Sequence, residues 1–483
     1  MSTTEALARF AASTRYQDIP ADVIQLAKRL ILDTFGNAAA GFATTGAKLA
    51  LRTAAEWGGT PESTVLVTGL RTSAPLAAFS NVSLASALEA DDTLLNIGHH
   101  AHVSLFPALA IAERVGASGA DLLKSFVLAY ELGGRIASAG HSVIRKPDGK
   151  LKFSETGVGV NWVTFPAVIG AGVQLGFDTN TMASALGLAG VSSSIPTGRR
   201  WNRPGWCHMK YNAYAFMAQG GVQAALLAHN GFTGDPDIFD GEANQVKANW
   251  WQMSGSVAYS PEAATGGLGE RWLMRGAAFK PYPSCRFTHG ALAGFRKIMD
   301  EGGLTPGEIE AVDIYTGRTM FVFKMDRPEV MGEEDAQFSM PHLIAMVALG
   351  VRRGPEWVAE RYWDDPAVES IKAKVTCHAD DDANGVLVEQ LVANNFEKFP
   401  YRIKVKARGR LFEASGDYAP GDPFASETMF GDKEVIGKVR DFAEPILGAS
   451  KLDDLIEAIM NLERAPRLST LFGRLVQART GST

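Results

Sequence analysis

The chain has 483 residues, room for about three domains of ordinary size, and its 46% apolar and 21% charged residues exclude global disorder. The 47 Lys and Arg residues against 53 Asp and Glu residues give a net charge of −6, which argues against nucleic-acid or anionic-membrane binding through overall charge. A local basic pocket for a small anion stays compatible with this balance. Disulfide frameworks and four-thiolate zinc sites need more cysteines than the three present, Cys207, Cys285 and Cys377.

The sequence predicts neither a signal peptide nor a membrane-spanning segment. Residues 1–5 lack the basic stretch and apolar core of a signal peptide. The longest nearly apolar run, 165–177, is too short to span a bilayer. We therefore expect a cytoplasmic protein in a reducing compartment, with no membrane partner and no nucleic-acid partner.

The first half of the chain is predicted to be helical. Apolar residues recur at helical spacing from Val23 to Thr34, and Gly36 is expected to end or break this helix. Ser118 and Asp121 form an expected capping box for a later helix. Further helices are expected over about 74–92, 106–115, 166–175, 180–188 and 211–229. Their small residues indicate a tightly packed all-α bundle over residues 1–275.

The pattern changes near residue 276. Alternating residues around Val312 and Ile314 and over 370–377 predict strands, and 401–413 predicts a hairpin with one charged face. With helical patterns at 337–349 and 355–363, residues 276–424 are expected to form an α+β domain. Helical spacing returns over 425–483. These last helices either dock on the α+β domain or return to the first bundle.

The densest polar cluster holds three acidic residues and three histidines within fourteen residues. Its members and the adjoining threonine are Glu89, Asp91, Asp92, Thr93, His99, His100 and His102. On a helix, Glu89 and Thr93 would share one face. The residue types suit metal ligation or acid/base catalysis, although the spacing matches no ligand motif such as H-E-x-x-H. A capped helix end followed by a polar loop is the alternative.

Two further clusters carry basic residues. The loop at 198–210 holds Arg199, Arg200 and Lys210, which can clamp a carboxylate or supply a base, or can be solvated surface residues. The rigid stretch 279–289 holds Lys280, Cys285 and Arg286. Cys285 is either a nucleophile or an inert buried thiol. No P-loop, G-x-G-x-x-G or G-x-S-x-G sequence is present, so nucleotide-fold and hydrolase-elbow readings have no support.

In this order and spacing, the clusters resemble the MmgE/PrpD family, which includes 2-methylcitrate dehydratase, cis-aconitate decarboxylase and iminodisuccinate epimerase. The matching stretches are 28–36, 88–93, 100–113, 116–123, 278–289 and 336–339. The resemblance implies a large all-helical domain, built from the N-terminal part and the C-terminal helices, and a smaller α+β lid. It also implies a homodimer, a site between the domains, a small di- or tricarboxylate substrate, and no metal or organic cofactor.

The resemblance also carries over individual residues. Asp91, Asp92 and Thr93 match an acidic family pattern whose first acid is here Glu89. Spacing to Pro107 selects His100 as the family histidine, with His99 second, and the two family lysines fall on Lys210 and Lys280. The resulting expectation has His100 and Lys210 as base and acid, Asp91 tuning His100, and Lys280 as a further catalytic residue. The expected substrate-binding residues are Glu89, Thr93, His99, Arg199, Arg200, Cys285 and Arg286.

Two departures from the decarboxylase branch bear on the reaction. Gly157 and Cys285 stand where that branch has histidines. We therefore expect a hydro-lyase acting on a hydroxylated di- or tricarboxylate. The alternatives are an epimerase or isomerase, a cis-aconitate-type decarboxylase, and a binding homologue without catalytic activity.

Overall fold

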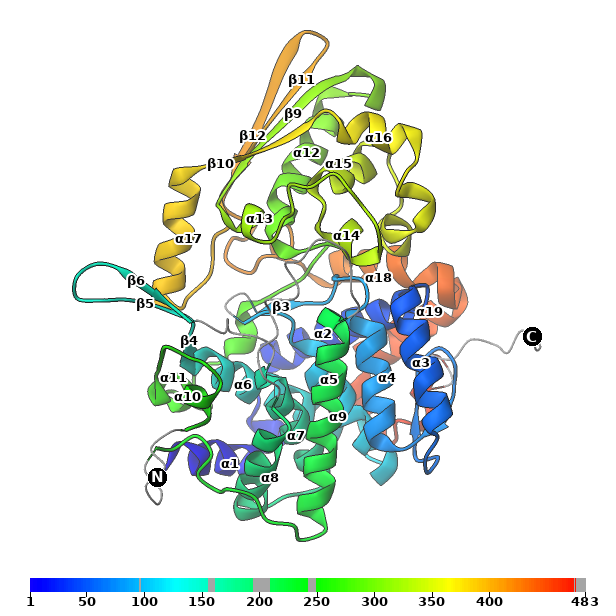
Figure 1. The fold of residues 1–483 in the computed structure, drawn as a ribbon. Coiled ribbons are helices and arrows are strands. Elements are labelled where there is room, and N and C mark those ends of the chain that lie inside the picture. The colour runs from blue at the N-terminus through cyan, green and yellow to red at the C-terminus, as the bar shows by residue number, and fades with distance from the viewer. Residues whose placement is uncertain (95–96, 155–160, 194–208, 242–248, 473, 475–483) are drawn as a thin grey trace.

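The structure is a computed structural model that describes residues 1–94, 97–154, 161–193, 209–241, 249–472 and 474; the side chains of residues 209–212, 470 and 472 lie outside the description. It is mostly helical, with a few small sheets. Figure 1 shows a large helical domain below and a smaller α+β domain above it. This is the fold class that the sequence predicts.

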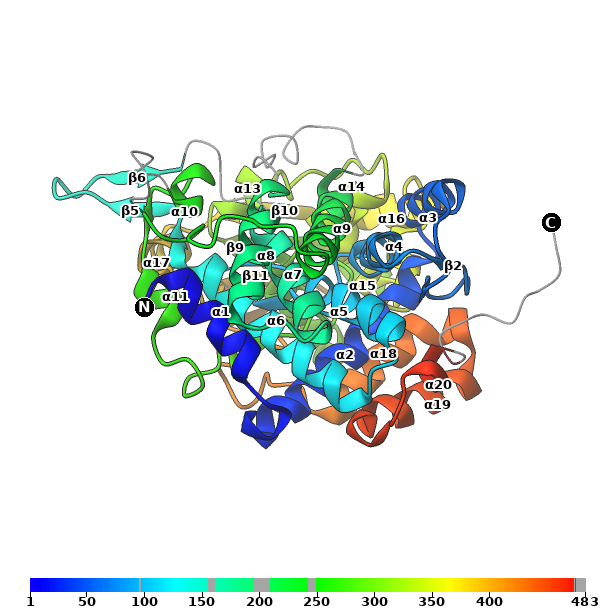
Figure 2. The same ribbon diagram turned by 90° about the horizontal axis from the view of Figure 1, so that it is seen from below.

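The helical domain is built mainly from long helices that pack side by side, as Figure 2 shows from below. They are α1 (Thr3–Ser13), α2 (Ala21–Gly41), α3 (Thr45–Trp57), α4 (Ala74–Ser86), α5 (Ala101–Val115), α6 (Gly119–Ala139), α7 (Thr164–Gln174), α8 (Thr179–Val191), α9 (Met209–His229), α10 (Trp250–Met253) and α11 (Pro261–Thr265). Short strand pairs join them: β1 (Ser63–Thr64) with β2 (Arg71–Thr72), β3 (Thr93–Leu94) with β8 (Ala277–Ala278), β4 (Gly140–His141) with β7 (Ala258–Tyr259), and β5 (Val143–Arg145) with β6 (Leu151–Phe153). Within the described residues, no helix combines the length and apolar character that a bilayer crossing requires.

The last helices share the core of the first ones. One apolar core takes residues from Leu7 to Phe279 and again from Val435 to Leu471. Here α18 (Asp432–Leu447) packs along α2, and α19 (Ala449–Met460) and the short α20 (Ser469–Phe472) follow it. The expectation that Gly36 ends or breaks its helix is wrong, because α2 continues to Gly41. A Cβ at Gly36 would lie 3.0 Å from Val439, so this glycine allows α18 to approach closely.

The smaller domain is organised around a four-stranded sheet in the order β10-β9-β11-β12. Its strands are β9 (Ile309–Thr316), β10 (Val375–Ala379), β11 (Tyr401–Ala407) and β12 (Arg410–Gly416). Its helices are α12 (His289–Gly302), α13 (Thr319–Val322), α14 (Glu333–Phe338), α15 (Met340–Ala348), α16 (Pro366–Lys372) and α17 (Asp381–Ala393). The predicted hairpin is confirmed: β11 and β12 pair antiparallel across a turn in which Arg408 (φ 53°) and Gly409 (φ 67°) are left-handed.

The predicted strand over residues 370–377 is wrong in its first part and right in its second part. Residues up to Lys372 belong to α16, and β10 begins at Val375. The helix starts because Asp365 accepts hydrogen bonds from the N–H groups of Ala367 and Val368, with proline at the first helical position. The predicted helix at 355–363 is likewise two short 3-10 turns.

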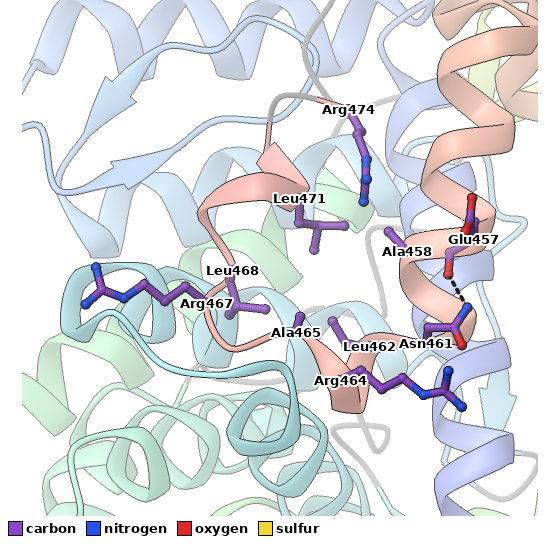
Figure 3. A pocket seen from close by; sticks show the side chains of 10 residues that line it. All are labelled: Glu457, Ala458, Asn461, Leu462, Arg464, Ala465, Arg467, Leu468, Leu471 and Arg474. Atoms are coloured by element: carbon purple, nitrogen blue, oxygen red, sulfur yellow. Dashed lines mark hydrogen bonds between the residues drawn. The ribbon is translucent and has the colours of Figure 1, made fainter.

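A pocket of about 340 Å³ lies at the C-terminal segment, between α19 and α20. Figure 3 shows Leu462, Leu468 and Leu471 toward its interior, while the side chains of Arg464 and Arg467 extend outward. None of its lining residues belongs to the polar clusters that the sequence singles out. This pocket is therefore not the candidate site.

We expect Gly119→Ala to destabilise the helical domain by about 1–3 kcal/mol, because the new methyl group would overlap the carbonyl oxygen of Leu462. Gly437→Ala on α18 is the control, since a Cβ there meets no atom within 4 Å and should stabilise the helix by about 0.5–1 kcal/mol. Chemical denaturation of both variants measures the difference. Equal stabilities would mean that the C-terminal segment does not press on α6.

Candidate active site

The acidic cluster forms a turn and a strand, and its predicted place on a helix is wrong. Helix α4 ends at Ser86, Glu89 adopts a left-handed φ of 53°, and Thr93 begins strand β3. Glu89 and Thr93 therefore share no helical face. Because Thr93 pairs with Ala278 of β8, this turn lies beside the stretch that leads to Lys280. A non-glycine residue in this backbone region is strained and persists only where its surroundings hold it.

His99 lies between two carboxylates of this turn. Its Nε2 is 3.0 Å from Glu89 Oε1, and its Nδ1 is 3.0 Å from Asp91 Oδ1. The ammonium of Lys280 is 3.4 Å from the same Nδ1 and 3.5 Å from Glu89 Oε1. His99 is 13% exposed, whereas the side chains of the other three are at most 2% exposed. The ring of His99 is thus the part of this cluster that an incoming molecule can reach.

The charges of the cluster shift its proton affinities. Burial alone would lower the pKa of His99, but the carboxylates of Asp91 and Glu89 outweigh it and raise that pKa above its ordinary value. Burial would raise the pKa of Asp91, yet His99 and His102 hold it below its usual range. The two carboxylates therefore favour the protonated form of His99.

Two further side chains pack against this cluster, His102 against Asp91 and Tyr214 against His99. His102 Nδ1 lies 3.0 Å from Asp91 Oδ2, and the ring of Tyr214 on α9 packs edge-on against His99 with centroids 5.7 Å apart. Burial and the nearby carboxylates raise the pKa of Tyr214 well above its ordinary value, so it stays neutral. In the described part of the chain, no three acidic, histidine or cysteine side chains are placed to hold a metal ion.

His100, the histidine that spacing selects, lies in a different environment. It is fully buried, and its Nε2 is 2.6 Å from the backbone oxygen of Tyr130, to which it donates as a neutral imidazole. Burial lowers the pKa of His100 to about 3. Its ring packs against Tyr130 and Trp162 rather than against Asp91. The histidines that Asp91 contacts are His99 and His102, so the expectation that Asp91 tunes His100 is wrong.

Asp92 ties the turn to the start of α5. Its carboxyl group accepts hydrogen bonds from the N–H of Ala101 and the hydroxyl of Tyr130, both at 2.7 Å. Burial raises the pKa of Asp92 to about 6. This residue orients the loop that carries His99 and does not itself meet His99.

Arg286 is the second buried cation of the 279–289 stretch. It pairs with Asp422 and lies over the ring of Phe399 at 5.6 Å. Its Nε and Nη1 are buried without a hydrogen-bond partner among the described residues. Burial lowers the pKa of Arg286 to about 9. Two free donors on one guanidinium suit a carboxylate.

Two more residues from the sequence-based set are buried, Cys285 and Thr93. Cys285 is a buried thiol whose backbone N–H donates to the carbonyl of Gln337 at 3.1 Å. The Thr93 hydroxyl is buried and has no hydrogen-bond partner in the described part of the chain. His289, which is not among the site residues expected from the sequence, donates to the backbone oxygen of Ser284 at 3.0 Å, and burial beside Arg286 and Lys280 holds its pKa well below its ordinary value.

Several expected site residues fall outside the described part of the structure. These are Arg199, Arg200 and Gly157, and also the side chain of Lys210, whose backbone lies in the first turn of α9. The structure thus brings Glu89, Asp91, His99 and Lys280 together, with Arg286 on the same stretch as Lys280. His100 stands apart from them.

The sequence analysis missed two charged residues beside the turn, Asp33 of α2 and Lys438 of α18. Their side chains form a buried ion pair with Nζ 2.6 Å from Oδ1. A signal was present in the sequence: Lys438 sits in the apolar stripe of its helix, between Val435 and Phe442, where a solvated lysine has no place.

A histidine titration followed by NMR should separate the two neighbours. We expect His99 to titrate above its ordinary pKa and His100 to stay neutral over about pH 5–8. Because the pKa of His100 is depressed by folding, its stabilising contribution is complete above the unfolded pKa and is lost as pH falls toward about 3. Because folding raises the pKa of His99, its stabilising contribution is complete below the unfolded pKa and is lost as pH rises through the folded pKa. Titration of His100 near neutrality would contradict this arrangement.

Comparison with known proteins gives matches along most of the chain. Residues 5–249 match the MmgE/PrpD N-terminal domain, and residues 282–464 match the MmgE/PrpD C-terminal domain. The chain is 27% identical over 310 residues to the cis-aconitate decarboxylase-like protein oryM of Aspergillus oryzae, an alignment that covers 62% of each chain. It is 23% identical over 303 residues to the cis-aconitate decarboxylase of Aspergillus terreus, covering 61% of this chain and 60% of that relative. With the Homo sapiens cis-aconitate decarboxylase the identity is 26% over 362 residues, covering 72% and 70%.

The alignments thus span about three-fifths of the length of the two fungal relatives. The two domain matches, in contrast, cover both structural parts of the chain. Glu89, Asp91 and His99 lie within the first match, and Lys280 lies in the short stretch between the two. This protein belongs to the MmgE/PrpD family.

Proposed function

We propose that this protein is a cofactor-independent lyase that dehydrates a small hydroxylated di- or tricarboxylate. The observation that carries the proposal is His99, an imidazole 13% exposed and held between two carboxylates that raise its pKa. An acid of this kind can protonate a departing hydroxyl group. The family and the decarboxylase names of the relatives support a lyase in general.

Dehydration also needs a base that removes the proton next to a carboxylate. The electron pair of that C–H bond forms the double bond, while the hydroxyl group leaves as water with the proton of His99. We assign this base to Lys210, which the sequence analysis pairs with His100 as acid and base; it lies one helical turn before Tyr214, whose ring packs on His99. This role replaces the expected base, His100, in the proposal, because His100 is bonded to a backbone carbonyl.

Positive charge supplies the second half of the proposal. Loss of a proton next to a carboxylate places negative charge on that carboxylate, and buried cations stabilise such charge without reorganisation. Lys280 is fully buried beside His99, and Arg286 has two free donors. These residues are proposed to hold two carboxylates of one substrate, consistent with a di- or tricarboxylate.

Decarboxylation is the second candidate, and the names of the relatives favour it. The same His99 would protonate the carbanion that remains after carbon dioxide leaves. The counter-observation is Cys285, a buried thiol where the resemblance expects a histidine. The proposed assembly is a homodimer, as the family resemblance implies. The proposed location is the cytoplasm, as expected from the sequence.

Incubation with 2-methylcitrate, citrate and cis-aconitate in deuterated water tests the reaction class. An alkene product followed in the ultraviolet supports dehydration, and release of carbon dioxide identifies decarboxylation instead. Deuterium entering the substrate without an alkene indicates epimerisation. Stabilisation by these acids in thermal denaturation without any turnover would mean that the protein only binds them.

We expect His99→Gln to lower turnover by about 10²-fold or more, because a positioned general acid is removed. His378→Gln is the matched control: this histidine also pairs with a carboxylate, Asp313 at 2.7 Å, but on the outer sheet of the smaller domain. Steady-state rates of both variants measure the difference. Full activity of His99→Gln would remove His99 from the reaction.

We expect Arg286→Gln to raise KM for a tricarboxylate by about tenfold or more, with a smaller effect on an acid that lacks one carboxylate. Arg296→Gln is the control, since Arg296 makes an exposed pair with Asp300 on α12. Equal KM values for Arg286→Gln and the unchanged protein would show that the guanidinium does not hold substrate.

A further inference from the structure

A buried ion pair outside the acid cluster joins the two ends of the helical domain. Lys438 of α18 and Asp33 of α2 are each 1% exposed, and their charged atoms are 2.6 Å apart. Burial lowers the pKa of Lys438 and raises that of Asp33, so the pair costs desolvation on both sides. Apolar residues of the same volume would often stabilise such a site equally well. Net stability alone therefore gives no reason for the pair.

The pair does something else: it supplies a hydrogen-bond donor to the acidic turn. Lys438 Nζ donates to the carbonyl oxygen of Ala90 at 2.6 Å. Asn37 Nδ2 donates to the same oxygen at 3.3 Å and to Asp33 Oδ2 at 3.2 Å. Two side chains thus donate to the one carbonyl group that stands between Glu89 and Asp91, and Asp33 contacts both of these donors.

That carbonyl lies where the backbone most needs support. Glu89 is held at a φ of 53°, and Ala90 lies in a small apolar core between the domains with Leu88, Phe442 and residues of the smaller domain. A non-glycine residue in this left-handed conformation is strained and persists only where surrounding contacts hold it. On the other side of the turn, Gln337 donates to the carbonyl of Ala87 at 2.9 Å.

We propose that Lys438, Asp33 and Asn37 are positioning residues that fix the Ala90 carbonyl and so hold Glu89 and Asp91 at hydrogen-bond distance from His99. The inference rests on the proposed function in that His99 is the acid. It adds that the strength of this acid is set from α2 and α18, through residues that contact neither His99 nor a substrate.

The chain contains a matched control on the same helix. Lys28 of α2 is 2% exposed, donates to the carbonyl of Met460 at 3.0 Å and pairs with Glu463 at 2.7 Å. It too is a buried lysine that ties α2 to the C-terminal part of the chain. Its partners, however, lie outside the acidic turn. Lys28→Met therefore removes a buried lysine between α2 and the C-terminal part of the chain and leaves the hydrogen bonds to Ala90 intact.

The test is the titration of His99 in full-length protein with labelled histidine, its signal being identified by its absence in His99→Gln. The variant is Lys438→Met with Asp33→Asn, which leaves the net charge unchanged. We expect the pKa of His99 to fall by about 1 pH unit in this variant, because Glu89 and Asp91 drift from the ring. In Lys28→Met the melting temperature should fall while the pKa of His99 stays unchanged.

An unchanged pKa of His99 in the double variant would overturn the inference and make the pair a purely structural tie. Should the double variant fail to fold, Asn37→Ala decides, since it removes one donor to Ala90 and leaves the ion pair; a lower pKa of His99 supports the inference and an unchanged one overturns it. Failure of the proposed function is a separate result, because it is read from the turnover of His99→Gln. The titration requires no substrate.

Discussion

Charge balance in a dry interior governs the junction of the two domains. Glu89, Asp91 and Lys280 place two carboxylates and an ammonium group around the imidazole of His99, and Lys438 and Asp33 add an ion pair beside them. A buried charge without a partner is strongly destabilising. Each element that meets here must therefore place its charged side chain next to a partner of opposite charge. This requirement constrains α2, α18 and the turn after α4 together.

This constraint also explains how the smaller domain is attached. On α18, one turn beyond Lys438, the carbonyl groups of Arg440 and Asp441 accept hydrogen bonds from Arg352, and the Asp441 carboxylate pairs with Arg353. The helix that supports the acidic turn is thus the helix on which the smaller domain rests. A movement of the smaller domain would be transmitted to Lys438 by helix α18 rather than by a loop.

The sequence predicted the regular parts of this protein well, since hydrophobic period and turn chemistry are local. The hairpin at Arg408 and Gly409 and the capping box at Ser118 are examples. It failed where long-range contacts decide. The left-handed Glu89 has no local signature, and the choice between His99 and His100 depends on which ring the Asp91 carboxylate reaches. Lys438 was missed because its partners are hundreds of positions away in the chain.

The chain order of α2 and α18 has a consequence for biosynthesis. Helix α2 leaves the ribosome early with an almost wholly buried surface, and the helix that covers its Gly36 face comes near the end of the chain. At 5–20 residues per second, the intervening chain takes roughly 20–80 s to synthesise. Throughout that interval Asp33 has no cation and the apolar side of α2 has no cover. The ion pair between Asp33 and Lys438, and the hydrogen bond from Lys438 to Ala90 in the acidic turn, can therefore form only after α18 has been synthesised.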